Sequence, residues 1–244
     1  MKPSAFEWPH GLRAAVSLTF DDARRSQIDH GMPLFKELGV RATFYVNPAR
    51  ARDRLEGWRK AYLEGHEIGN HTRHHPCSET YEWSREHAIE DYSLSRMEEE
   101  LVGCNDDVQA LIGVRPQTFA YPCGQTYVGR GEGQTSYIPL VAEHFLAGRG
   151  VGAETNDPVS CELACLEAAS FDERSLSDVA PLIERALDEG SWLILFGHEI
   201  RETSGFMVTE TRALTELCRY LSDPKRGIWL DTVEAVATQI TRNR

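Results

Sequence analysis

The feature that most constrains the fold is a regular alternation: short apolar runs are followed by longer segments whose apolar residues recur at helical spacing. The runs expected to be strands are residues 15–20, 42–46, 67–69, 117–121, 144–151, 192–196 and 228–230. The segments expected to be helices are residues 33–38, 55–63, 84–112, 138–143, 176–189 and 209–221. About seven such β–α units predict a parallel sheet, either closed into a barrel or doubly wound.

Polar residues at the ends of the expected strands discriminate between these two folds. A closed barrel brings the C-terminal ends of all its strands to one mouth, whereas an open sheet gathers only those at its switch point. Five polar residues end five different strands: Asp21, His71, Tyr121, Arg149 and His198. We therefore expect a barrel, formed by residues 1–244 as a single domain, because 244 residues is a common length for one such domain. Residues 123–137 are glycine-rich and irregular, and we expect them to form a substrate-facing loop.

Composition narrows the partners and the compartment. The net charge is −12 with no block of lysine and arginine, which argues against nucleic acid and favours a neutral or cationic substrate. The N-terminus has no charged start followed by an apolar stretch, and no run of eighteen apolar residues occurs, so no export or membrane segment is expected. The six cysteines show no paired spacing, which predicts reduced thiols in the cytoplasm, or secretion if a leader was removed.

Two short segments carry the residues that can bind a metal ion. Asp21 and Asp22 follow the apolar run 14–20, and adjacent residues leaving a strand point in different directions, so one carboxylate can bind while the other stays free as a base. His71 and His75 are one helical turn apart, which would place both rings on one side. A solvated turn at the aspartates and a His71/His74 ligand pair are the alternatives. Three such ligands leave open positions for water and substrate.

At this point the chain resembles the polysaccharide deacetylase family (carbohydrate esterase family 4). Residues 19–22 (TFDD) resemble its first motif and residues 65–76 (GHEIGNHTRHHP) its second. Residues 119–124 (FAYPCG) resemble the third motif, and residues 192–199 (WLILFGHE) resemble the last. The resemblance spans nearly the whole chain in the family's order, and it implies a distorted TIM-like (β/α)7 barrel.

The resemblance implies a role for each motif residue. Asp21 would be the catalytic base, and Asp22, His71 and His75 would hold one divalent metal ion, with Zn²⁺ as the first expectation and Co²⁺, Ni²⁺ or Mn²⁺ as alternatives. A metal-bound water would attack an acetyl carbonyl, and His198 would be the general acid. Metal-activated water beside a carboxylate base is chemically consistent with these roles.

The third motif contains the expected oxyanion donor but lacks the arginine that the family usually has there. Within the Tyr121-Pro122-Cys123 segment, the backbone N–H of Cys123 would stabilise the oxyanion. The family's third motif usually opens with an arginine that supports the base, but Ala120 stands there. Arg149, at the end of another expected strand, could supply the missing guanidinium, the alternative being a surface arginine.

Two further features stay open at the level of sequence. The family's fourth motif, whose aspartate tunes the acid histidine, has no convincing match, and Glu199 or Asp157 could take its place. Some aromatic residues on the expected loops could stack on a sugar or pack in the core: Trp83, Tyr121, Tyr127 and Tyr137.

The sequence thus predicts a metal-dependent hydrolase that removes acetyl groups from a carbohydrate, with no nucleic-acid or membrane partner. Three alternatives remain: a hydrolase of a small non-sugar amide on the same barrel, a non-haem iron oxygenase, and a carbohydrate-binding homologue with impaired catalysis. The substitution at Ala120 and the unmatched fourth motif suggest the last of these, whereas Asp21 and His198 argue against it.

Overall fold

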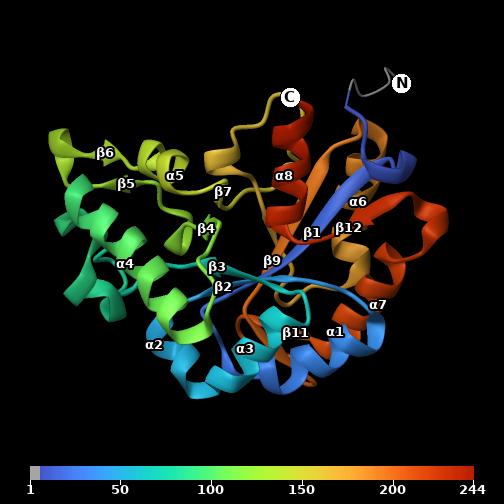
Figure 1. The fold of residues 1–244 in the computed structure, drawn as a ribbon, viewed down its shortest axis with the longest axis horizontal. Helices are drawn as coiled ribbons and strands as arrows, with labels where there is room; N and C mark the ends of the chain where they lie inside the picture. The colour runs from blue at the N-terminus through green and yellow to red at the C-terminus, as the bar shows by residue number, and fades with distance from the viewer. Residues whose placement is uncertain (1–5) are drawn as a thin grey trace.

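The computed structural model describes residues 6–244, which form one curled parallel sheet surrounded by helices (Figure 1). The sheet runs in the order β7-β4-β3-β2-β1-β9-β8, and β12 lies beside the start of β1. Its strands are β1 (Ala14–Asp21), β2 (Thr43–Val46), β3 (Glu67–Asn70), β4 (Thr118–Ala120), β7 (Ala147–Arg149), β8 (Ala169–Ser170), β9 (Trp192–Gly197) and β12 (Ile228–Leu230).

The sheet curls because the segment before β8 pairs with β7 at the opposite end. Leu166 forms a parallel bridge with Arg149, and the backbone N–H of Gly150 donates to the Leu166 carbonyl over 2.8 Å. β12 pairs only with Ala14 to Val16, at the start of β1, whereas β2 pairs with the last three residues of β1. Seven strands therefore make up the path around the barrel. The predicted distorted (β/α)7 barrel is confirmed.

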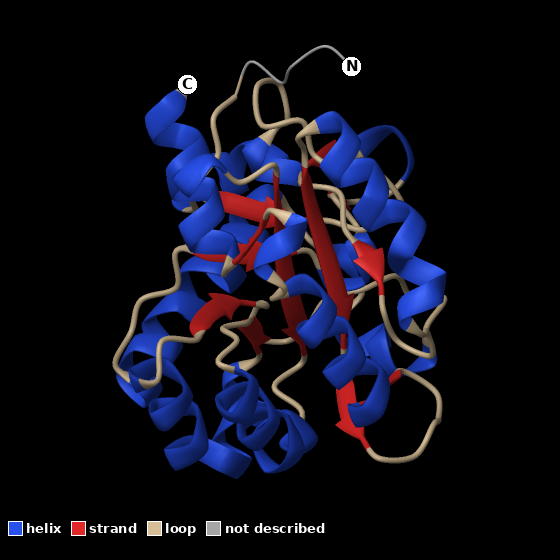
Figure 2. Cartoon of the chain, turned by 90° about the vertical axis from the view of Figure 1, so that its right-hand side faces the viewer, coloured by secondary structure: helices blue, strands red, loops and turns tan. Residues whose placement is uncertain are grey.

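Helices cover the outside of the sheet (Figures 1 and 2). They are α1 (Met32–Leu38), α2 (Pro48–Ala51), α3 (Leu55–Leu63), α4 (Leu94–Ile112), α5 (Ile138–His144), α6 (Leu176–Glu189), α7 (Thr211–Leu221) and α8 (Val233–Asn243). Both faces of β1 are buried, because Val16 and Leu18 join the core under α1, α6 and α7 while Ala15 packs in a second cluster that includes α8. An apolar strand buried on both faces is typical of a parallel sheet. None of the helices in residues 6–244 has the length and apolar character needed to cross a bilayer.

The structure departs from the predicted elements in several places. The helix expected from residue 84 begins at Leu94, where the Ser93 hydroxyl accepts a hydrogen bond from the Arg96 N–H, and residues 82–91 form 3-10 turns instead. Residues 123–137, predicted to be irregular, contain a small antiparallel hairpin of β5 (Tyr127–Val128) and β6 (Thr135–Ser136). The sequence analysis also missed β8, α8 and the pair β10 (Glu199–Arg201) and β11 (Val208–Glu210).

Candidate metal centre and active site

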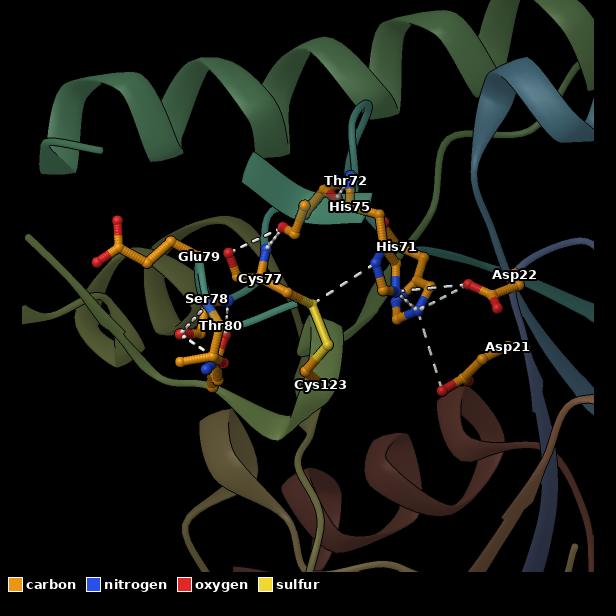
Figure 3. The surroundings of a disulfide bond; sticks show 12 residues. Asp21, Asp22, His71, Thr72, His75, Cys77, Ser78, Glu79, Thr80 and Cys123 are labelled. Atoms are coloured by element: carbon orange, nitrogen blue, oxygen red, sulfur yellow. Dashed lines mark hydrogen bonds and ion pairs between the residues drawn. A yellow bond between two sulfur atoms is a disulfide. The ribbon is translucent and has the colours of Figure 1, made fainter. Parts of the chain in front are cut away.

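The residues expected to act together meet at the C-terminal edge of the sheet, because each lies at the end of a parallel strand. Asp21 ends β1, Arg149 ends β7, His71 follows β3 and His198 follows β9. Asp22 has a positive φ of 77°, a conformation that non-glycine residues rarely adopt. Figure 3 shows both carboxylates beside the two imidazoles.

Asp22, His71 and His75 form a group that could hold a metal ion. The Nε2 atoms of the two histidines are 3.1 Å apart, and Asp22 Oδ1 lies 3.4 Å from His75 Nε2 and 3.7 Å from His71 Nε2. Ligands that bind zinc tetrahedrally at ~2.0–2.2 Å lie roughly 3.4 Å from one another. The three donor atoms therefore have the spacing and the chemistry that a divalent ion requires.

The second oxygen of Asp22 is occupied by arginines. Arg24 Nη2 donates to Oδ2 over 2.7 Å, and Arg50 Nη1 lies 3.2 Å from the same oxygen. Burial alone would raise the pKa of Asp22, but the charges of His71 and His75, followed by those of the two arginines, hold this pKa well below its usual value. Asp22 is thus ionised with Oδ1 turned toward the histidines.

Asp21 is the second buried carboxylate and has a different partner. The Arg149 guanidinium donates to both of its oxygens, and both side chains are almost fully buried. Burial would raise the pKa of Asp21, but the charge of Arg149, with those of His71 and His198, lowers it below the usual value. The arginine that the third motif lacks at Ala120 is therefore supplied, in space, by the neighbouring strand, because Ala120 pairs with Arg149 in the sheet.

The two candidate histidine ligands, His71 and His75, are placed by an irregular loop and not by the helical turn that the sequence analysis expected. The Asn70 side chain accepts from the Thr72 N–H over 2.8 Å, and both Thr72 and His75 have positive φ angles. Such conformations cost about 1–3 kcal/mol each and persist only where the surroundings hold them. His71 Nδ1 donates to the Ala120 carbonyl over 2.9 Å, which leaves its Nε2 facing Asp22.

Burial accounts for the protonation of these rings. It lowers the pKa of His71, against the opposing effect of the two aspartates, and burial together with the charge of His71 lowers the pKa of His75 to about 4. Both imidazoles are therefore neutral near pH 7, as metal ligands must be.

His74 is turned away from this group. Its Nδ1 donates to Glu100 Oε1 over 2.6 Å, and its ring stacks on His87 at 4.4 Å. Glu100, on α4, also accepts from the backbone N–H groups of Arg73 and His74, so it fixes the loop that carries the ligands. The alternative pair His71/His74 does not match this arrangement.

His198 has a carboxylate partner that the sequence analysis missed. Its Nδ1 donates to Asp172 Oδ2 over 2.6 Å, and its backbone N–H donates to Oδ1 over 3.0 Å. Burial would lower the pKa of His198, but the hydrogen bond to Asp172 and the charge of Asp21 raise it above its usual value. Thr209 fixes Asp172 by donating to Oδ1 over 2.8 Å. Asp172 therefore holds the Nδ1 side of His198, and protonation of this ring is more favourable than that of an ordinary imidazole.

The residues considered for that role have other partners. Glu199 accepts from the Ser26 hydroxyl over 2.5 Å and pairs with Arg201 at 3.3 Å. Asp157 accepts from the backbone N–H of Val159 over 2.9 Å in a local turn. The suggestion that either residue tunes His198 is wrong. Asp172 comes soon after the short strand β8, whose two residues are too few to give a strand signal in the sequence.

The third motif lies in the turn Pro122–Gly124, where Cys123 has a φ of 54°. The Tyr121 side chain is buried, and its hydroxyl donates to the Ala164 carbonyl over 2.6 Å. Tyr121 and Tyr137 are thus core residues, the second of the two alternatives considered for them. Trp83 and Tyr127 are exposed, and the Trp83 ring lies 5.5 Å from that of His75.

Cys77 and Cys123 are joined by a disulfide (Figure 3). The prediction that the cysteines are reduced thiols is wrong for this pair, because two positions 46 residues apart become neighbours only in the folded chain. A second group of possible metal ligands, formed by His75, Cys77 and Cys123, has both sulfurs in this disulfide. Such sulfurs are not thiolate ligands. Of these two groups, the one with Asp22 has free donor atoms.

Comparison with known proteins identifies the family. Residues 10–130 match the model described as polysaccharide deacetylase. The chain is also 30% identical over 93 residues to the uncharacterized protein YlxY of Bacillus subtilis (strain 168), a match that spans 38% of this chain and 26% of YlxY. The chain belongs to the polysaccharide deacetylase family. Its match covers about a quarter of the length of YlxY.

Solved structures share the fold. A protein from Mycobacterium smegmatis assigned to the polysaccharide deacetylases has a TM-score of 0.71 at 14% identity, with 97% of this chain and 93% of that chain covered. A family 4 acetyl xylan esterase from Clostridium thermocellum, solved with a cobalt ion, has a TM-score of 0.58 at 19% identity, with 92% and 90% covered. The (β/α) barrel is thus common to all three chains.

Proposed function

We propose that this protein is a metal-dependent hydrolase that removes acetyl groups from a carbohydrate, and that residues 1–244 form its catalytic domain. The observation that carries the proposal is the juxtaposition of an ionised carboxylate, Asp21, with the separate candidate ligand group of Asp22, His71 and His75. Family membership supports an acetylated carbohydrate as substrate. The related esterase with its cobalt ion supports the use of a divalent metal.

The chain's own residues divide the reaction between them. A divalent ion held by Asp22, His71 and His75 would supply a Lewis acid and lower the pKa of a bound water to about 7. Asp21, kept ionised by Arg149, would take a proton from the attacking water. The Cys123 N–H would donate to the oxyanion that develops on the acetyl carbonyl.

His198 completes the proposed mechanism as the general acid. Asp172 holds its Nδ1 and raises its pKa, so that Nε2 can deliver a proton to the departing sugar oxygen or nitrogen. Asp21 and His198 both lie at this site, but their pKa values move in opposite directions, as a base and an acid require.

Impaired catalysis is less well supported than it was from the sequence. Its two grounds were Ala120 in place of an arginine and the unmatched fourth motif. Arg149 contacts the base and Asp172 contacts the acid histidine, so both expected functions have a candidate residue. A small non-sugar amide remains the alternative substrate.

We also propose that the protein works in an oxidising compartment. Disulfides persist in such compartments and are rare in the cytosol, and Cys77 and Cys123 form one beside the candidate metal centre. This favours the second of the two localisations considered, secretion, over the cytoplasm.

The test combines metal analysis with acetate release. The purified protein should carry about one divalent ion per chain and release acetate from a panel of N- and O-acetylated oligosaccharides. Treatment with a chelator should abolish release, and added Zn²⁺ or Co²⁺ should restore it. Acetate release that is unaffected by complete metal removal would contradict the proposed mechanism. Hydrolysis of acetylated non-sugar amides alone would replace the carbohydrate by the alternative substrate.

A further inference from the structure

The Cys77–Cys123 disulfide connects two segments that the proposed mechanism uses. Cys77 follows the candidate ligand His75 by two residues, in the loop after β3 (Figure 3). Cys123 lies in the turn after β4, and its backbone N–H is the proposed donor to the oxyanion. Cys77 is fully buried, whereas Cys123 is exposed. The disulfide therefore lies at the border between the site and the solvent.

At its buried end, the disulfide contacts the outer nitrogen of a metal-ligand candidate. His71 and His75 point their Nε2 atoms toward Asp22, but their Nδ1 atoms have different partners. His71 Nδ1 faces the Ala120 carbonyl at 2.9 Å, and His75 Nδ1 faces Cys77 Sγ at 3.7 Å. The outer partner of a ligating histidine fixes its ring orientation, and losing that partner typically reduces metal affinity about 10-fold to 100-fold. For His75 this partner is a disulfide sulfur.

At its exposed end, the disulfide holds a residue in an unfavourable conformation. Cys123 has a φ of 54°, as His75 has on the other side of the link. A non-glycine residue keeps such a conformation only where its surroundings impose it. A hydrogen bond from the Ser78 N–H to Gln125 Oε1 over 2.9 Å joins the same two segments beside the disulfide.

We propose that the Cys77–Cys123 disulfide is a positioning element of the site: it orients His75 for the metal and Cys123 for the oxyanion, so that loss of the link lowers both turnover and the metal affinity of the group formed by Asp22, His71 and His75. The inference rests on the proposed function for its effect on turnover, but its effect on metal affinity is independent of the substrate. The protein would accordingly be most active after oxidation.

The redox step is ordinary thiol–disulfide exchange at the exposed sulfur. A thiolate of an external dithiol attacks Cys123 Sγ, the Cys77 sulfur leaves as a thiolate and takes up a proton, and the second thiol of the reductant then releases Cys123. The protein disulfide gains two electrons and two protons, and the dithiol becomes a disulfide. The exposure of Cys123 makes it the accessible point of attack.

The test compares the oxidised and reduced forms of the wild-type protein with a Cys77→Ala/Cys123→Ala variant. A phosphine is the reductant, because a dithiol would itself bind the metal; it is oxidised to the phosphine oxide with oxygen from water. Co²⁺ and Zn²⁺ affinities are measured by competition with a chromogenic chelator, and kcat and KM by acetate release. Circular dichroism checks that each form is folded. A Cys165→Ala variant, which keeps the disulfide, is the matched control.

Because reduction also frees two thiols beside His75 that could bind metal themselves, metal affinity is compared between oxidised wild type and the double variant. We expect the double variant to bind metal about 10-fold or more weakly than oxidised wild type and oxidised Cys165→Ala, and not to respond to the phosphine. We expect reduction to lower kcat at saturating metal in wild type and in Cys165→Ala while changing KM little. Equal metal affinity and equal kcat in the folded double variant and the oxidised wild type would overturn the inference. So would free thiols at both positions in unreduced protein. Oxidised protein that binds metal tightly but releases no acetate would instead contradict the proposed function.

Discussion

The two ends of the sheet each bury a carboxylate, and their surroundings drive the two pKa values in opposite directions. At the C-terminal edge, Asp21 ends β1 and contacts the Arg149 guanidinium, so its pKa is lowered despite burial. At the N-terminal edge, Glu67 begins β3 and accepts hydrogen bonds from the Thr43 and Thr118 hydroxyls. None of the main influences on Glu67 in residues 6–244 comes from a cation, and burial raises its pKa to about 7.

The comparison shows that the partner, and not burial alone, decides whether a carboxylate is available as a base. A guanidinium stabilises the charged form directly, whereas neutral hydroxyl and amide donors compensate only part of the desolvation. Glu67 also accepts from the Glu234 N–H over 2.9 Å, which links the start of α8 to the start of β3. We infer that the N-terminal edge uses its carboxylate to join elements, and the C-terminal edge keeps its own ready for proton transfer.

Replacing Arg149 with methionine should have the largest effect on the difference between the pKa values of Asp21 and Glu67. Asp21 would then be buried without a cation, as Glu67 is, and its pKa would rise. Because the base must be ionised, the acidic limb of the pH profile of kcat/KM should move to higher pH, and kcat/KM near pH 7 should fall at least about tenfold. In Arg149→Lys, which keeps a positive charge, kcat/KM near pH 7 should fall less. An unchanged acidic limb in a folded, metal-loaded Arg149→Met protein would show that Asp21 does not depend on this partner.

Replacing Asp172 with asparagine tests the acid in the same way. The hydrogen bond and charge of Asp172 raise the pKa of His198, so their loss should lower it. The acid form of His198 would then be lost at lower pH, and the basic limb of the kcat profile should move to lower pH, with roughly a tenfold or smaller loss of kcat at its optimum. Metal content should not change. A basic limb that stays in place would argue against His198 as the acid.

Replacing Glu67 with glutamine should leave turnover unchanged and alter only stability. The folded-state pKa of about 7 lies above the unfolded value near 4.5, so the folded protein binds the extra proton and wild-type stability falls as pH rises between these values. The amide oxygen of glutamine can accept from the Thr43 hydroxyl and the Glu234 N–H, and its NH2 group can donate to the Thr118 hydroxyl, so the site is satisfied without a charge. The difference in unfolding free energy between Glu67→Gln and wild type, measured by urea titration, should therefore shift in favour of the variant by roughly a few kcal/mol between pH 4.5 and pH 8. The same difference in unfolding free energy at both pH values would show that the pKa of Glu67 is not raised in the folded protein.

The strand ends were predictable because local patterns specify them. An apolar run followed by Asp21 and Asp22, and a short run followed by His71, place these groups at strand ends without any knowledge of long-range contacts. The barrel then brings Arg149 to Asp21. The only hint of this contact in the sequence is that position 120 is an alanine where the family usually has an arginine.

Contacts between distant segments were not predictable in the same way. Asp172 meets His198 across 26 residues because β8 pairs with β9, and β8 has only two residues, too few for a periodic signal. The disulfide joins loops after β3 and β4 that have no characteristic cysteine spacing. In both cases the partner is set by sheet topology, which local patterns do not encode.

The central claim is that adjacent aspartates have different functions, Asp22 as ligand and Asp21 as base. The most direct test measures metal content and kcat side by side in folded Asp21→Asn and Asp22→Asn. The account predicts that Asp21→Asn keeps about one metal ion per chain and loses at least about 10² in kcat, the range for a general base, whereas Asp22→Asn loses the metal. Loss of metal from both variants alike, or near-normal turnover in metal-loaded Asp21→Asn, would contradict it.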